Sequence, residues 1–137
     1  MCSSDLAPDR ELVDDLLELM RAQRVDFTGF FRALSAGTAR MMFTEPEPFD
    51  AWAARRAAVL PADLAAVAAA MDRVNPAYIP RNHRAEEALA QAARGEMGPF
   101  HRLLEAVSRP FQERPGLENY AGPAPAGSAP HVTYCGT

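Results

Sequence analysis

Apolar residues recur every three or four positions along most of the chain, and this spacing predicts amphipathic helices. In the first of them, leucines, a valine and a methionine form one face, while aspartates and glutamates fill the other. Further apolar stripes follow, so that six helical segments are predicted, at about residues 9–24, 27–36, 49–60, 61–74, 84–94 and 100–107. No segment shows the strict alternation that is typical of a half-buried β-strand. The pattern therefore predicts an all-α fold.

Proline and glycine mark the places where these helices begin and end. Gly37 is expected to stop the second helix, because glycine is the usual residue just past a helix end. The two prolines within residues 44–48 predict a loop, since each lacks an amide donor and restricts the residue before it. Pro61 suits the first turn of the helix that follows, and Asn75-Pro76 is expected to end that helix.

The chain is expected to have three parts. Residues 1–6 have neither the basic nor the apolar region of a signal peptide, and they resemble a translated sequencing adapter. We interpret them as an artefact before native sequence that begins near Ala7; a short disordered start is the alternative. Residues 7–111 carry the helices. Residues 112–137 are predicted to be an irregular tail, because the many prolines and glycines at 112–130 leave too little apolar surface to offset the entropy of ordering.

Composition excludes several classes of protein. Apolar residues make up 48% of the 137 residues, yet no run approaches the roughly 18 that a membrane span needs. The net charge of −4 argues against nucleic acid as a partner. All 14 basic residues are arginines, so no lysine is present to form a Schiff base or to hold a nucleotide's phosphates. The alanine-rich and arginine-only usage indicates a GC-rich bacterial genome, and with no signal segment we expect a cytoplasmic location in bacteria.

Histidine and cysteine are the first candidates for chemistry. The candidate metal ligands are His83, His101, His131 and Cys135. Only His131 and Cys135 are close in sequence, and they lie in the tail where nothing fixes their geometry, so no metal site is predicted. The histidines are interpreted as surface or capping residues. Cys135 has no evident oxyanion-hole loop or orienting group, so it is not predicted to be a catalytic nucleophile. A redox role or a disulfide suits an accessible thiol better.

The segment Arg81-Asn82-His83-Arg84 superficially resembles the catalytic loop of protein kinases, but it lacks the aspartate base and the later asparagine. A structural role is therefore predicted. Asn82 is expected to cap a helix that begins at Arg84, and Arg81 is expected to bridge carboxylates or carbonyls between helices. Adjacent carboxylates elsewhere point in different directions on their helices, so they are not predicted to be acid–base pairs. No catalytic or cofactor-binding residue is predicted in the chain.

Several short blocks form a recognisable pattern. They are Arg24-Val-Asp-Phe-Thr-Gly-Phe-Phe-Arg-Ala-Leu34, Phe49-Asp-Ala-Trp52, residues 75–89 (Asn-Pro-Ala-Tyr-Ile-Pro-Arg-Asn-His-Arg-Ala-Glu-Glu-Ala-Leu), Phe100-His-Arg-Leu-Leu104, Arg109-Pro-Phe111 and Tyr134-Cys-Gly-Thr137. Over about residues 9–137, this pattern resembles the carboxyl-terminal region of the SelO (YdiU) protein adenylyltransferases. The chain departs from that family at Arg55-Arg56, where a further aromatic residue is common.

The resemblance implies a kinase-like (pseudokinase) fold. It also implies an enzyme that transfers AMP from ATP to serine, threonine or tyrosine hydroxyls of proteins and that uses a divalent metal, usually magnesium. Its nucleotide-holding and metal-binding groups lie upstream in that family, and no position of this chain matches them. The chain is therefore expected to be the helical carboxyl-terminal part of the C-lobe, inactive alone, with the kinase-like core as its partner. Asn75, Pro76, Arg81 and Asn82 are carried over as structural residues, and Cys135 as the redox or disulfide position.

Two other functions remain open from the residues alone. The chain could be a free-standing helical interaction module that binds a partner through its phenylalanine-rich face. It could also be a small redox protein that depends on Cys135. In either case no nucleic acid or membrane is expected as a partner.

Overall fold

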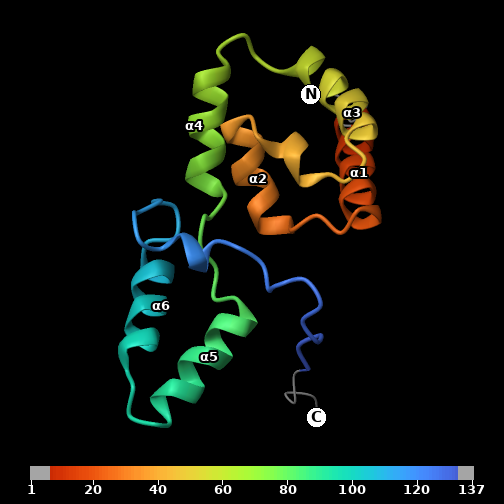
Figure 1. Ribbon diagram of the computed structural model, residues 1–137. Helices are drawn as coiled ribbons and strands as arrows, with labels where there is room; N and C mark the ends of the chain where they lie inside the picture. The colour runs from red at the N-terminus through yellow and green to blue at the C-terminus, as the bar shows by residue number, and fades with distance from the viewer. Residues whose placement is uncertain (1–6, 133–137) are drawn as a thin grey trace. The chain divides into compact units, whose positions relative to one another are not determined.

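The computed structural model describes residues 7–132, and every regular element within that range is helical (Figure 1). The predicted all-α class is confirmed. The chain divides between Asn75 and Pro76 into two compact units, which are described separately below. None of the described helices is both long enough and apolar enough to cross a membrane.

Within residues 7–75, the first unit holds four α-helices and one short 3₁₀-helix. Their bounds are α1 Ala7–Ala22, α2 Phe27–Ala36, η2 Ala39–Met42, α3 Glu47–Val59 and α4 Leu64–Val74. Within this unit α1 packs against α3, and α2 packs against α4 (Figure 1). The four α-helices correspond to the first four that the apolar pattern predicts. The 3₁₀-helix was not predicted, since four residues are too few to show a period.

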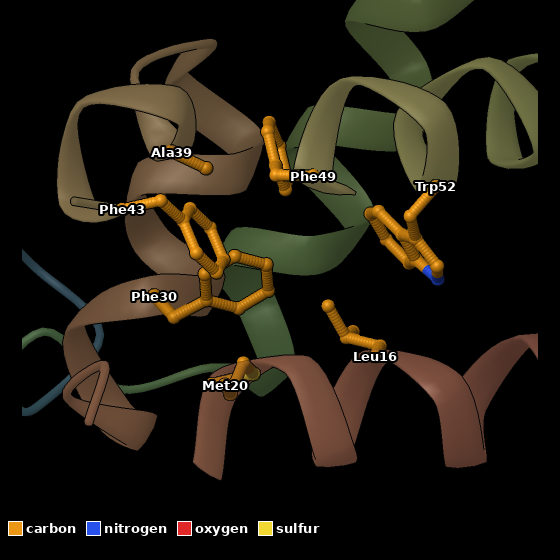
Figure 2. Close-up of a cluster of buried hydrophobic side chains, with 7 residues drawn as sticks. All are labelled: Leu16, Met20, Phe30, Ala39, Phe43, Phe49 and Trp52. Carbon is orange, nitrogen blue, oxygen red and sulfur yellow. The ribbon is translucent and has the colours of Figure 1, made fainter. Parts of the chain in front are cut away.

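Aromatic side chains fill the core of this unit. Phe30 is fully buried and lies edge-on to Phe43 and Phe49, which stack on each other with ring centroids 4.8 Å apart. Figure 2 shows two side chains of α1, Leu16 and Met20, pointing toward these rings. Burying such side chains supplies most of the stabilisation that a small helical unit can obtain. The phenylalanine-rich stripe is therefore mainly core.

Polar contacts fix the helices of the first unit around that core. The indole Nε1 of Trp52 on α3 donates to the carbonyl oxygen of Leu12 on α1 at 2.9 Å. The carboxylate of Asp26 caps α2 by accepting from the amide of Gly29 at 2.9 Å. A Cβ at position 29 would lie 2.7 Å from this carboxylate, so glycine is the residue that fits beneath the cap. Gly37 ends α2 with a φ of 78°, as predicted.

In the first unit, the starts of α3 and α4 differ from the sequence predictions. α3 begins at Glu47, inside the predicted loop, because a proline at the second position of a helix needs no amide donor. Pro61 lies before α4 rather than in its first turn. The helix begins at Leu64, where the side chain of Asp63 accepts from the amide of Ala66 at 3.0 Å. An aspartate cap therefore sets the start of α4.

The second unit contains α5 Asn82–Ala92, α6 Gly98–Ser108 and the 3₁₀-helix η3 Glu118–Tyr120. α5 and α6 pack side by side as a helical hairpin (Figure 1). Leu117 is buried, and it clusters with Ala77, Tyr78 and Ala106. This packing differs from the expectation that residues 112–130 run over the surface without packing. Leu117 and Tyr120, in the first half of the segment, give it enough apolar surface to pack against this cluster.

Candidate functional site

The block of residues 75–89, which carries much of the family resemblance, meets the turn that follows α6. The amides of Ala77 and Tyr78 both donate to the carbonyl oxygen of Pro110, at 2.8 and 3.3 Å. Tyr78 is 3% exposed and Ala77 is 6% exposed. The hydroxyl oxygen of Tyr78 accepts from the backbone amide of Arg114 at 2.9 Å. The block therefore joins the end of α6 to the segment that leaves it.

Arg114 closes the carboxyl end of α6. Its guanidinium donates to four backbone carbonyl oxygens, those of Glu105, Ala106, Arg109 and Gln112, at 3.0 to 3.2 Å. The same guanidinium lies over the ring of Tyr78, 5.5 Å from its centroid. The last carbonyls of a helix have no partner within the helix and carry partial negative charge, so a cation satisfies them well. Arg114 thus fixes the direction in which the chain continues.

Two further arginines, from the start of α5, hold the next turn of the segment. Arg81 donates from Nη2 to the carbonyl oxygen of Ala121 at 2.9 Å, and Arg84 donates from Nε to that of Asn119 at 3.1 Å. Arg84 also lies over the ring of Tyr120, 5.7 Å from its centroid, and pairs with the carboxylate of Glu87, about one turn further along α5. Planar guanidinium groups suit such multiple contacts. Three arginines therefore anchor residues 112–121.

The structural residues predicted from the sequence have different outcomes. Asn75 follows the last residue of α4, as predicted, and its carbonyl oxygen accepts from Arg32 Nε at 2.8 Å. Arg81, expected to bridge carboxylates or carbonyls between helices, donates to the carbonyl oxygen of Ala121, the residue after η3. The prediction that Asn82 caps the following helix is wrong. The helix begins at Asn82 itself, and Arg81 occupies the cap position without a side-chain bond to the helix.

A groove of about 610 Å³ lies in the second unit, between residues 79–86 and residues 124–132. The imidazole Nδ1 of His131 lies 2.9 Å from a carboxylate oxygen of Glu86 across it. His83 also lines the groove. Its pKa lies below the usual value because burial disfavours the charged form, and the charges of the two neighbouring arginines add to this. The groove therefore brings two histidines and one carboxylate to its walls.

The candidate metal residues do not assemble into a site in the part of the chain that the structure describes. His83 and His131 share the groove, whereas His101 lies beside Phe100 on α6, with ring centroids 5.9 Å apart. Cys135 lies outside the described residues. Among residues 7–132, no group of three or more histidine, cysteine, aspartate or glutamate side chains is arranged to hold a metal ion.

Sequence reasoning missed two arginines that organise this architecture. Arg114 was not singled out, and Arg32 was read only as part of a motif. Arg32 closes the end of α4, where it donates to the carbonyl oxygens of Asp72 and Asn75. No local sequence rule predicts these contacts, because Arg32 lies on α2 and the carbonyls that it binds lie about forty residues further along the chain. The role of Arg114 could have been predicted, because an arginine a few residues after a helix end often binds the last carbonyl oxygens of that helix.

The fold and this site define a helical scaffold in which arginine side chains close helix ends and anchor an irregular segment. No family model matches the chain. It is similar to the protein nucleotidyltransferase YdiU of Mycolicibacterium paratuberculosis, with 49% identity over 92% of this chain and 27% of that protein. The YdiU proteins of Pseudarthrobacter chlorophenolicus and Sphingopyxis alaskensis are 47% and 44% identical over 93% and 98% of the chain.

The resemblance to the SelO (YdiU) family that the motifs indicate is therefore confirmed: the chain corresponds to a part of such a protein. It spans about a quarter to a third of the length of the curated relatives it matches, from 26% to 30%. This coverage is consistent with the predicted position as a carboxyl-terminal fragment.

Proposed function

We propose that this chain is the helical carboxyl-terminal scaffold of a YdiU-type protein adenylyltransferase, part of the C-lobe of a kinase-like fold. In the longer protein, the upstream core holds ATP and a divalent metal and transfers AMP to hydroxyl groups of proteins. The observation that carries this proposal is the sequence identity of 44–49%, over at least 92% of the chain, to a limited part of proteins named protein nucleotidyltransferase YdiU.

The chemistry of the described side chains supports a scaffold role. Nucleotidyl transfer needs cations and donors directed at phosphate oxygens, together with carboxylates or amides that hold the metal. Here Arg81 and Arg114 donate to backbone carbonyls, and Arg84 pairs with a carbonyl and a carboxylate. Within residues 7–132 these arginines are engaged and no group of side chains is arranged to hold a metal ion, so we derive no catalytic step from the described residues.

The role that we assign to the chain is to hold the carboxyl-terminal segment in a fixed path. Arg114 ties the segment to the end of α6, Arg81 and Arg84 contact it at Ala121 and Asn119, and the segment then lines the groove beside α5. Cys135 follows a few residues later, and we propose that it serves as a redox or disulfide position in the longer protein. A bacterial cytoplasmic location is part of the same proposal.

A chimera tests this function. The matching portion of the M. paratuberculosis YdiU protein is replaced by this chain, and transfer of label from [α-³²P]ATP to protein is measured with magnesium. We expect the chimera to label protein, whereas the same relative without that portion labels little. ATP labelled at the γ-phosphate serves as the control, because AMP transfer leaves no γ-label on the acceptor. A folded chimera that is no more active than the truncated relative would contradict the proposal.

A further inference from the structure

The helix α4 has apolar residues on all its faces but a partner on only some of them. All of its residues except Asp72 and Arg73 are apolar, yet none of them is buried. Leu64 at its start is 61% exposed. Its main partner in the first unit is α2, with a further contact from Arg56 of α3 to Met71. Because a helix that is apolar all round is normally buried, α4 presents a face that a further partner would cover.

A groove runs along that helix. It has a volume of about 540 Å³ and lies between the carboxyl end of α2, the carboxyl half of α3 and α4. Its apolar lining includes Leu34, Leu60, Pro61, Leu64, Val67 and Met71. Residues 57–71 contain a single charged side chain, that of Asp63, and its carboxylate is engaged as the cap of α4. Apart from one arginine, the groove lining is therefore uncharged, although just outside it the carboxylate of Asp72 accepts from the lining residue Ser35 and pairs with Arg32.

Arg56 is the exception, because its guanidinium lines this groove. Its hydrogen-bond partner is the thioether sulfur of Met71, 3.3 Å from Nη2, and no carboxylate of the described residues forms an ion pair with it. Burial lowers the pKa of Arg56, although the group stays charged. A sulfur atom is a weak acceptor, so within the described residues this partly buried charge has no strong acceptor.

The neighbouring Arg55 shows the contrast. It lies on the same helix and pairs with the carboxylate of Asp15 on α1 at 2.7 Å. Its side chain is 48% exposed and is not part of the groove lining. The two adjacent arginines therefore differ in one respect that matters for binding: Arg55 has an acidic partner within the unit, and Arg56 has none among the described residues.

We propose that this groove binds an amphipathic helical segment of a partner protein, whose apolar side chains fill the groove and whose single carboxylate pairs with Arg56. The positive charge of Arg56 selects the partner, because a cation in an apolar groove favours a ligand that carries one carboxylate among apolar residues. An apolar helix face laid into a groove between helices is a recurring recognition mode. This inference is independent of nucleotidyl transfer.

Selection from a display library of random 16-residue peptides tests the proposal, with the purified chain as the target. We expect enriched peptides to carry apolar residues at helical spacing around one aspartate or glutamate. The best peptide is then synthesised, together with a version in which glutamine or asparagine replaces the acid. Binding of both to the chain, to Arg56→Gln and to Arg55→Gln is measured by fluorescence anisotropy.

We expect Arg56→Gln to weaken binding of the acidic peptide about tenfold or more, while Arg55→Gln changes it less than twofold. Neutralising the peptide should weaken binding to the wild-type chain but not to Arg56→Gln. Leu64→Asp, which places a charge in the groove, should abolish binding of both peptides. Circular dichroism and the fluorescence of Trp52 confirm that each variant is folded.

Several results would overturn the proposal. They are the absence of any enriched peptide, enriched peptides without a carboxylate, and binding that Arg56→Gln leaves unchanged. Sedimentation velocity tests a different occupant. If the chain forms a dimer that Arg56→Gln and Leu64→Asp both dissociate, then a second copy fills the groove and the proposed partner is wrong.

Discussion

Replacing Arg114 with glutamine removes the group that closes α6 and fixes the segment after it. The guanidinium donates to four carbonyl oxygens and lies over Tyr78. One of these bonds, to Ala106, is partly buried and should contribute about 1.5–3 kcal/mol, since the donor is charged. The exposed bonds can be replaced by water, and the contact with the ring adds about 0.5–1 kcal/mol. We expect a total loss of about 2–4 kcal/mol in the free energy of unfolding of the second unit.

Urea unfolding followed by tyrosine fluorescence measures this loss, because Tyr78 and Tyr120 lie in the second unit, whereas the single tryptophan lies in the first. With a denaturant dependence of about 1 kcal/mol per molar urea, the midpoint should fall by about 2 M or more. Arg109→Gln is the matched control, since no hydrogen bond or ion pair of its side chain is found within residues 7–132, and it should change stability by less than about 0.5 kcal/mol. Equal midpoints for the two variants would refute the anchoring role of Arg114.

Three further predictions concern single residues. Phe30→Ala should destabilise the first unit by about 3–5 kcal/mol, because the ring is fully buried, and urea unfolding followed by Trp52 fluorescence measures it. Asp63→Ala should cost about 1 kcal/mol by removing the cap of α4, whereas Asp63→Asn should cost little; an equal loss in both would exclude capping. The lowered pKa of His83 means that the unfolded chain binds the proton more readily, so stability should fall as the pH falls through and below about 6.5. His83→Gln should reduce this fall, as thermal unfolding at pH 5 and pH 7 would show.

The helices were predictable from the sequence because each depends mainly on local pattern. The spacing of apolar residues in α1 and α6 and the glycine at position 37 place these elements within a few residues of their observed bounds. The predicted end of α4 at Asn75-Pro76 is also local, since proline restricts the residue before it. The start of α4 was predicted less well. Pro61 suggested a start there, but the helix begins after Asp63, whose side chain caps it.

The contacts that organise the site could not be predicted in this way. Arg32, Arg81 and Arg114 each satisfy carbonyl oxygens whose positions depend on the packing of other helices. The apolar groove beside α4 likewise exists only once three helices meet, and the difference between Arg55 and Arg56 appears only in the folded unit. The sequence shows that lysine is absent and that arginine is the only permanently charged basic residue, but it does not show which arginine has an acidic partner.

The central claim is that this chain is a scaffold and supplies no group that moves AMP. Incubating the purified 137-residue chain with [α-³²P]ATP and magnesium, alone and with the M. paratuberculosis YdiU protein from which the matching portion has been removed, tests it most directly. The account predicts no labelled protein from the chain alone. Stoichiometric labelling by the chain without any other protein would contradict it.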